Sequence, residues 1–282
     1  MADKTVLVTG ATGKQGGATL RHLAKRGGVK LRAMTRNPDG DAAKALAGLG
    51  VDVVQGDLDD NASLTKALTG AWGVFSVQNT WEAGVEKEEE QGKRLAKLAK
   101  DAGVQHFVYT SVGSAHLKTG IPHFDNKARV EETVRQLGFP SYAILRPVFF
   151  MENLPSPWFL QGDKLMTAML PTTKLQMIAS DDIGKFGAQA FLEHEKWNRA
   201  EVDLAGDSAT MVEAAAAVSE LLGKTVTFEP IPIAAVRQNS DDMATMLEWF
   251  DRVGYSADIA SLEGKWGIKP LTLREWVRSQ KK

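Results

Sequence analysis

Three glycines near the start of the chain stand between a short apolar run and a helical pattern. Gly10, Gly13 and Gly16 follow residues 5–9, and leucines at helical spacing come next. The N-terminus of a helix has N–H groups without intrahelical partners and a partial positive charge, so it favours phosphate. Gly10 is expected to make a tight turn, Gly13 to let the backbone approach phosphates, and Gly16 to let the helix pack on the strand. The spacing predicts a binding loop for the pyrophosphate of a dinucleotide. The alternative is an ordinary turn between a strand and a helix.

Arg36 lies where dinucleotide-binding folds usually carry an acid, at the end of the second predicted strand. That acid accepts hydrogen bonds from the adenosine ribose hydroxyls. A guanidinium at this place would instead pair with a 2′-phosphate, and Lys14 would add a second positive charge. We therefore expect NADP(H) rather than NAD(H) or S-adenosylmethionine. In the alternative, Arg36 and Lys14 are exposed cations that only aid solubility.

The third predicted strand closes with Gly56, Asp57 and Leu58. Asp57 is expected to accept a hydrogen bond from the adenine amino group, and Leu58 to cover the ring. The alternative for Asp57 is that it only caps the helix that follows.

The glycine spacing resembles that of the extended and atypical short-chain dehydrogenases/reductases. Those enzymes generally use Tyr-x-x-x-Lys, in which the lysine lowers the pKa of the phenol so that it can exchange a proton with the substrate. Here His123 precedes Lys127 by four residues, and Pro122 suits the first position of a helix that carries both. We expect Lys127 to keep His123 neutral, which argues against efficient carbonyl reduction. Ser111 is either a substrate-orienting serine or part of a strand-end turn. No clear replacement for the phenol is expected from the three tyrosines, which are Tyr109, Tyr142 and Tyr255.

Apolar runs alternate with amphipathic patterns through the first half of the chain, which predicts right-handed βαβ units in a parallel sheet. Strands are expected to begin near Thr5, Val29, Val51, Gly73, Val104 and Ser141. The pattern predicts a helix over 86–103, with the run 88–90 on a solvated face. Glu89 with Lys93 and Glu90 with Arg94 are at i,i+4 spacing on that helix.

After Pro147 the alternation gives way to an aromatic, proline-punctuated stretch. We predict an α/β fold, with a Rossmann doubly wound parallel sheet in residues 1–147 and a smaller C-terminal α+β lobe in residues 148–282. Residues 176–195, approximately, are expected to pack back on the Rossmann domain. Helices are predicted from Ser180 to about Glu195, and from Met211 to Leu222 with Gly223 at the end.

Composition narrows the function classes. The 282 residues carry a net charge of -1, which disfavours direct nucleic-acid binding, and no cysteine is present for disulfides or thiolate metal sites. The five histidines lack metal-site spacing, so we expect no metal. No apolar run approaches the roughly 20 residues of a membrane span. We expect a cytoplasmic protein that is a monomer or a homodimer and does not bind membranes.

Several blocks resemble the NmrA-like family, atypical relatives of the short-chain dehydrogenases that include NADPH-sensing regulators. The resemblance spans nearly the whole chain. Its blocks are residues 10–17, 35–38, 53–57, 79–82, 123–127, 152–154 and 271–276.

The resemblance implies a set of cofactor contacts. Arg36 would bind the adenosine phosphate, Asp57 and Leu58 the adenine, and Lys127 the nicotinamide ribose. The remaining implied contacts are Gly10, Thr12, Gly13, Lys14, Gln15 and Gly16 in the loop, Gln78, Asn79 and Thr80 along the ribose side, and Phe149, Phe150 and Asn153 beside the nicotinamide.

Two functions fit this reading. The first is a sensor whose NADPH or NADP occupancy changes its surface for a regulatory protein partner, and we favour it. The second is an NADPH-dependent reductase of a small apolar quinone, enone or carbonyl, with His123 and Lys127 as candidate catalytic residues. A structural module without a cofactor is hard to reconcile with the glycines and Arg36. For the reductase, an apolar pocket would be lined by Phe149, Phe150, Trp158, Met166 and Met169, which otherwise form the core of the second lobe.

Overall fold

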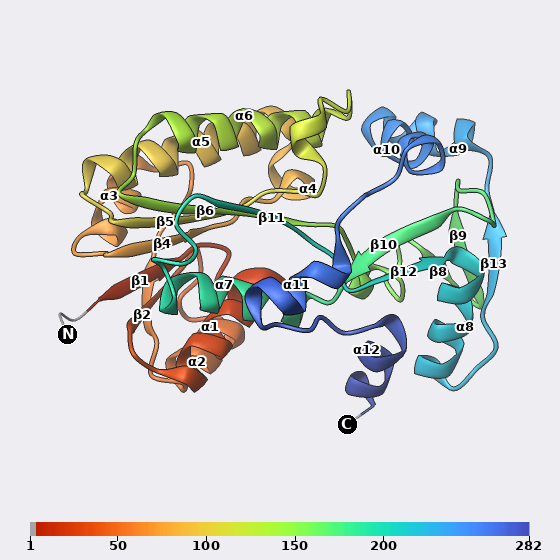
Figure 1. The fold of residues 1–282 in the computed structure, drawn as a ribbon, viewed down its shortest axis with the longest axis horizontal. Helices are drawn as coiled ribbons and strands as arrows, with labels where there is room; N and C mark the ends of the chain where they lie inside the picture. The colour runs from red at the N-terminus through yellow and green to blue at the C-terminus, as the bar shows by residue number, and fades with distance from the viewer. Residues whose placement is uncertain (1–3, 282) are drawn as a thin grey trace. The chain divides into compact units, whose positions relative to one another are not determined.

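The computed structural model describes residues 4–281 (Figure 1). The apolar runs of the first half become six of the seven strands of its largest sheet, and the seventh, from the second half, was not predicted. The seven strands are β1 (Thr5–Val8), β2 (Lys30–Thr35), β3 (Asp52–Gln55), β4 (Gly73–Ser76), β5 (His106–Thr110), β6 (Ser141–Pro147) and β11 (Ala200–Leu204). Their order is β11-β6-β5-β4-β1-β2-β3, and β1 to β6 pair in parallel. This is the doubly wound order that the alternation predicted. Strand starts differ from expectation by two residues at most, as at β5, which was expected near Val104.

Helices cover both faces of this sheet. Their bounds are α1 (Lys14–Arg26), α2 (Asp41–Ala47), α3 (Asn61–Leu68), α4 (Thr80–Ala83), α5 (Val85–Asp101), α6 (Pro122–Gln136) and α7 (Ser180–Leu192). In Figure 1, α3, α5 and α6 lie on one face, and α1, α2 and α7 lie on the other. Small residues allow α7 and α1 to approach each other closely. A Cβ atom on Gly184 of α7 would lie 2.5 Å from the Cβ of Ala18 in α1.

This close approach predicts a stability difference between two glycine substitutions. Gly184→Ala should lower the free energy of unfolding by about 1–3 kcal/mol, because its methyl group would overlap Ala18. Gly264 lies in α11, and a Cβ atom there would have no neighbouring atom within 4 Å. Gly264→Ala should therefore raise the free energy of unfolding by up to about 1 kcal/mol. Thermal melts of the two variants test the prediction, and equal effects would contradict it.

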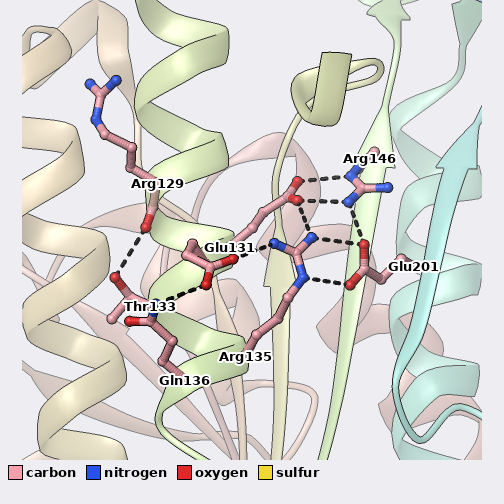
Figure 2. Close-up of polar contacts among 8 residues, drawn as sticks. Arg129, Glu131, Thr133, Arg135, Gln136, Arg146 and Glu201 are labelled. Carbon is pink, nitrogen blue, oxygen red and sulfur yellow. Dashed lines mark hydrogen bonds and ion pairs between the residues drawn. The ribbon is translucent and has the colours of Figure 1, made fainter. Parts of the chain in front are cut away.

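A ring of charged side chains fastens α6 to the strands β6 and β11 (Figure 2). Arg146 donates from Nε and Nη2 to the two carboxylate oxygens of Glu131, at 2.8 and 2.7 Å. Arg135 donates from Nε and Nη2 to Glu201, at 2.7 and 2.8 Å, and also from Nη2 to Glu131. The Glu131 and Arg146 side chains are only 1% and 6% exposed, so each buried charge has its counter-charge in the ring.

The described residues group into two compact units. The first contains residues up to 111, 125–146 and 183–202, and the second contains 112–124, 147–182 and the rest of the chain from 203. The predicted domain boundary at Pro147 and the packing of 176–195 on the Rossmann domain stay predictions. Between residues 4 and 281, no helix is both long enough and apolar enough to cross a bilayer.

The second unit has two small sheets and several helices, as an α+β lobe should. Its strands are β7 (Phe149–Phe150), β8 (Leu160–Gln161), β9 (Lys164–Thr167), β10 (Lys174–Ile178), β12 (Asp207–Thr210) and β13 (Thr227–Pro230), in the orders β12-β10-β7 and β13-β9-β8. Its helices are α8 (Met211–Leu222), α9 (Ile233–Asn239), α10 (Asp241–Arg252), α11 (Ile259–Trp266) and α12 (Leu273–Gln280), with 3-10 turns η1 (Ala115–Leu117) and η2 (Met151–Asn153). α8 has the predicted bounds, and Gly223 ends it at a φ of 64°. α7 ends at Leu192, before the expected Glu195.

The family-like blocks at 152–154 and 271–276 lie close together in this unit, where hydrogen bonds connect both to the start of α7. Glu152 Oε1 accepts hydrogen bonds from the backbone N–H and the hydroxyl of Ser180, each at 2.9 Å, and from Trp276 Nε1 at 3.2 Å. Asp182 accepts the backbone N–H of Leu271 at 2.7 Å. The blocks at 152–154 and 271–276 therefore hold the start of α7 to the C-terminal segment.

Candidate functional site

The glycine loop, residues 10–16, connects β1 to α1 and has no room for side chains at two of its glycines. Gly10 has a φ of 56°, and a Cβ atom there would lie 2.1 Å from Cγ1 of Val77. A Cβ atom on Gly16 would lie 2.4 Å from the carbonyl oxygen of Gly10. The tight turn at Gly10 and the close packing at Gly16 have the physical causes that the spacing indicated. Gly13 has an ordinary φ of -89°, so its backbone conformation does not require glycine.

The N-terminus of α1 remains open to an anion. Its N-cap residue, Gly13, supplies no side-chain acceptor, and its first turn has no acidic residue. Side chains fix the loop to neighbouring strands, since Thr110 donates to Gln15 Oε1 at 2.5 Å and Thr9 donates to the carbonyl of Val77 at 3.0 Å. The loop thus presents a positive helix end on a rigid support.

Strand order brings most of the expected dinucleotide contacts of the first unit to one edge of the sheet. The glycine loop follows β1, Arg36 follows β2, Asp57 and Leu58 follow β3, and residues 78–80 follow β4. These four strands are neighbours in the order β3-β2-β1-β4 and run in parallel. Their carboxyl ends therefore share the edge where doubly wound sheets bind ligands, next to the reversal of strand order between β1 and β4.

Arg36 is exposed, but it has an anionic partner that the sequence analysis did not identify. Its Nη2 lies 2.9 Å from Oε2 of Glu82, and the two side chains are 70% and 59% exposed. Asn79 donates to the other carboxylate oxygen of Glu82 at 3.1 Å. The guanidinium is thus available at the surface for an anion, and a carboxylate of the same chain contacts it.

Asp57 does not cap the following helix, so that alternative is wrong. The N-cap of α3 is Asp60, which accepts from the backbone N–H groups of Ala62 and Ser63. Asp57 accepts from the backbone N–H of Asp59 at 2.9 Å, an arrangement that shapes the loop. Leu58 packs against the core between the sheet and α3, α5 and α6.

Gln78 is buried at the end of β4 with half of its amide satisfied. Its Nε2 donates to Ser76 at 3.0 Å, whereas Oε1 is buried without a hydrogen-bond partner. An unpaired buried acceptor is costly and is typical of places that a ligand or an ordered water completes. This observation fits a role for Gln78 in binding.

Lys127 forms an ion pair with Glu88 of α5, whose side chain is 1% exposed. Thr80 also donates to Glu88, and Asn126 does so at 2.9 Å. Burial by itself would raise the pKa of Glu88, but Lys127 and these hydrogen bonds outweigh burial and hold the pKa below its usual range. The cluster fixes the position of the Lys127 ammonium group.

The expectation of a solvated run at 88–90 is therefore wrong for Glu88. The helical period places Glu88 on the inner face of α5, where Lys127 compensates its charge. Glu89 pairs with Lys93 as expected, at 2.5 Å. Arg94 reaches Asp59 at 3.2 Å and the carbonyl of Leu58, instead of forming the expected pair with Glu90.

Two of the three tyrosines have buried phenols. Tyr109 is fully buried in β5, and burial raises its pKa well above the usual value, helped by Glu88 and Glu131. Burial, with Asp203 adding to it, also raises the pKa of Tyr255 in the second unit. Tyr142 lies half-buried in β6. Ser111 is buried, and its backbone N–H bonds the carbonyl of Leu145, which continues the pairing of β5 with β6.

His123 belongs to the second unit, where its partner is a carboxylate of α10. Its Nδ1 lies 2.6 Å from Oδ2 of Asp242, and its backbone N–H donates to Oδ1 at 3.1 Å. The sequence analysis considered only Lys127 as the charged neighbour of His123 and did not identify Asp242. Asp242 fixes the orientation of the imidazole.

The residues expected beside the nicotinamide or around an apolar substrate pocket have different environments within the second unit. Phe149 and Met169 are buried in its core. Phe150, Asn153 and Met166 are half-buried, and Trp158 is 76% exposed. Phe149 and Met169 therefore contribute to the core of this unit, and their expected places beside the nicotinamide or in an apolar pocket stay predictions.

Comparison with known proteins gives consistent matches. The sequence model described as the NmrA-like family matches residues 2–278. An NmrA-like family domain-containing protein of Dictyostelium discoideum is 29% identical over 274 residues, which cover 89% of each chain. An NmrA-like family domain-containing oxidoreductase of Aspergillus sp. (strain MF297-2) is 33% identical over 257 residues, which cover 81% of this chain and 76% of the relative.

Solved structures with the same fold include an enzyme and a regulator. The NADPH-dependent quinone oxidoreductase of Escherichia coli, complexed with NADPH, has a TM-score of 0.82 and 26% identity, covering 98% of this chain and 100% of the other. NmrA, a negative transcriptional regulator, in complex with NADP, has a TM-score of 0.78 and 25% identity, covering 99% and 95%.

Proposed function

This chain belongs to the NmrA-like family, and we propose that it binds NADP(H) and acts as a sensor or regulator that responds to the NADPH/NADP state. The first unit would hold the dinucleotide through the glycine loop, Arg36, Asp57, Leu58, residues 78–80 and Lys127. The contacts expected from Phe149, Phe150 and Asn153 stay predictions, as do a regulatory protein partner, the monomer or homodimer state and a cytoplasmic location.

The residues of the first unit fit a dinucleotide. Gly10 and Gly16 leave no space for side chains, the first turn of α1 carries no acid, and Gln78 has an unsatisfied acceptor. When bound, the nicotinamide supplies or accepts a hydride. The chain's own contribution is to bind the phosphates at the positive end of α1 and to hold the Lys127 ammonium group in place through Glu88.

The preference for NADP(H) over NAD(H) is supported by the cation at the end of β2. Arg36 occupies the place of the usual ribose-binding acid, and its guanidinium is 70% exposed. Guanidinium groups bind phosphate through charge-assisted, bidentate hydrogen bonds. The NADPH-dependent quinone oxidoreductase of E. coli, solved with NADPH, is similar to this chain over nearly its whole length.

The sensor is favoured because His123 stands where the short-chain reductases carry their tyrosine, and because two of the three tyrosines are buried. The deciding observation concerns the tyrosine side chains. His123 occupies the position of the usual catalytic tyrosine, and Tyr109 is fully buried with a raised pKa. A phenol that remains protonated and out of reach cannot exchange a proton with a substrate oxygen.

A reductase of an apolar quinone, enone or carbonyl is the second candidate. It is supported by the similarity to the NADPH-dependent quinone oxidoreductase and to relatives named as oxidoreductases. Quinone reduction depends on placing the acceptor for hydride transfer more than on a strong protein acid. His123 and Lys127 are the candidate catalytic residues for that activity.

One experiment separates these functions. Calorimetric titration with NADPH, NADP, NADH and NAD measures binding, and the NADPH complex is then incubated with quinones, enones and aldehydes while nicotinamide absorbance is followed. Tight binding without oxidation supports the sensor, and oxidation by any acceptor establishes the reductase. The absence of binding to all four nucleotides would reject both.

The phosphate role of Arg36 gives a sharper prediction. Arg36→Asp should weaken NADPH binding about 100-fold, because it removes charge-assisted hydrogen bonds and adds repulsion, and it should change NADH binding by less than about threefold. Arg252→Asp, at an exposed position at the end of α10, is the matched control and should change neither. Equal losses for NADPH and NADH in Arg36→Asp would reject the proposed phosphate contact.

A further inference from the structure

Glu82 holds the guanidinium on which the proposed NADP(H) preference depends. Its Oε2 accepts from Arg36 Nη2 at 2.9 Å, and its Oε1 accepts from Asn79 Nδ2 at 3.1 Å. Asn79 is itself fixed, since its Oδ1 accepts the backbone N–H of Trp81 at the start of α4. Both carboxylate oxygens thus have donors, and the side chain is directed toward Arg36 by its own helix turn.

Sheet topology gives this ion pair a particular place. Arg36 follows β2 and Glu82 follows β4, and these two strands flank β1, which leads into the glycine loop. The pair therefore joins the loops on the two sides of the glycine loop. A ligand phosphate that binds Arg36 through Nη2 must replace the Glu82 carboxylate at that atom.

We propose that Glu82 is a specificity-determining residue, an internal competitor that occupies Arg36 and lowers the affinity of the chain for ligands with a 2′-phosphate. This inference rests on the proposed function, because it assumes that Arg36 receives that phosphate. A phosphate carries nearly two negative charges and three acceptor oxygens, so it displaces the single carboxylate. NAD(H) has a hydroxyl at this place and does not require the displacement. Glu82 therefore lowers the affinity for NADP(H) and leaves the affinity for NAD(H) unchanged, which reduces the ratio between the two affinities.

The test uses adenosine fragments, which isolate this end of the dinucleotide. Calorimetry compares 2′,5′-ADP with 5′-ADP on the full chain and on Glu82→Gln, in which the amide oxygen still accepts from Asn79. We expect Glu82→Gln to raise the affinity for 2′,5′-ADP about two- to fivefold, a small gain because exposed ion pairs are weak. The affinity for 5′-ADP should not change beyond experimental error. Glu82→Lys should give a larger gain in the same direction. Added salt should shrink both gains. Glu86→Gln, at an exposed position in the first turn of α5, is the matched control.

A double-mutant cycle separates failure of this inference from failure of the proposed function. In an Arg36→Gln background, Glu82→Gln should no longer change 2′,5′-ADP binding. If Arg36→Gln leaves the ratio of the two fragment affinities unchanged, the phosphate role of Arg36 itself is rejected. If Arg36→Gln lowers the ratio but Glu82→Gln does not raise it, only the competitor role is rejected. A loss of 5′-ADP and NADH binding in Glu82→Gln would make Glu82 a ribose ligand and would also overturn the proposal.

Discussion

Glu131→Gln is expected to lower the free energy of unfolding by about 3–5 kcal/mol, because it removes one carboxylate from a ring of two arginines and two glutamates. The Glu131 side chain is 1% exposed and binds Arg146 through both oxygens, so solvent cannot replace the lost charge. Arg146, which is 6% exposed, would keep only Glu201 as the carboxylate of this ring (Figure 2). Thermal and denaturant unfolding measure the loss.

The neighbouring residue provides the control. Glu132 lies on the same helix, is 56% exposed and is 3.4 Å from Arg135, so Glu132→Gln should change stability by less than about 0.5 kcal/mol. A double variant, Glu131→Met with Arg146→Met, should recover part of the loss, since it removes both buried charges. Similar losses for Glu131→Gln and Glu132→Gln would show that the ring contributes no special stability.

Acidification from pH 6.5 to about 4 is expected to lower the free energy of unfolding. We assign this loss to His106, which is buried in its neutral form. Its ring is fully buried, with Nδ1 2.8 Å from the hydroxyl of Ser141. Burial, assisted by the nearby His194 and Lys4, lowers the pKa of His106 to about 3. The unfolded chain binds a proton at this histidine near pH 6.5, whereas the folded chain does not until the pH is far lower. Its contribution is therefore complete above pH 6.5 and is lost as the pH falls toward 3, at about 1.4 kcal/mol per pH unit.

A neutral replacement tests this assignment. His106→Asn should flatten the dependence of unfolding free energy on pH by about that slope, even if the variant is less stable at pH 7. His116→Asn removes an exposed histidine and should retain the slope of the parent protein. Denaturant unfolding at several pH values gives both slopes. An unchanged slope in His106→Asn would assign the acid sensitivity to other groups.

The sequence predicted the fold well because its signals are local. Apolar runs with helical patterns between them define strands β1 to β6, and their parallel pairing follows from that alternation and from the handedness of the crossovers. The roles of Gly10 and Gly16 were also readable from spacing, because Gly10 turns the chain at a positive φ and Gly16 packs against the backbone of residues 9 and 10; that Val77 limits the space at Gly10 was not readable. The bounds of α8 followed from its start and from Gly223 at its end.

The partners of charged side chains were not readable in the same way. Arg36 with Glu82, Lys127 with Glu88, and His123 with Asp242 join residues that are far apart in the chain. A periodic pattern shows that Glu88 is charged, but it does not show which helix packs against its face. Glu88 was thus assigned to solvent, and Asp242 was left out of the environment of His123.

The sequence by itself determined that the chain has a doubly wound sheet, a glycine loop at the start of α1 and a cation at the end of the second strand. These features depend on backbone geometry and on side chains within about one turn or one strand of each other. Only the tertiary structure decided that Glu82 contacts this cation, that Glu88 compensates Lys127, and that Asp242 orients His123. The physical reason is that strand order and helix packing set the neighbours of each charge, and those neighbours decide whether it is stabilised, displaced or exposed.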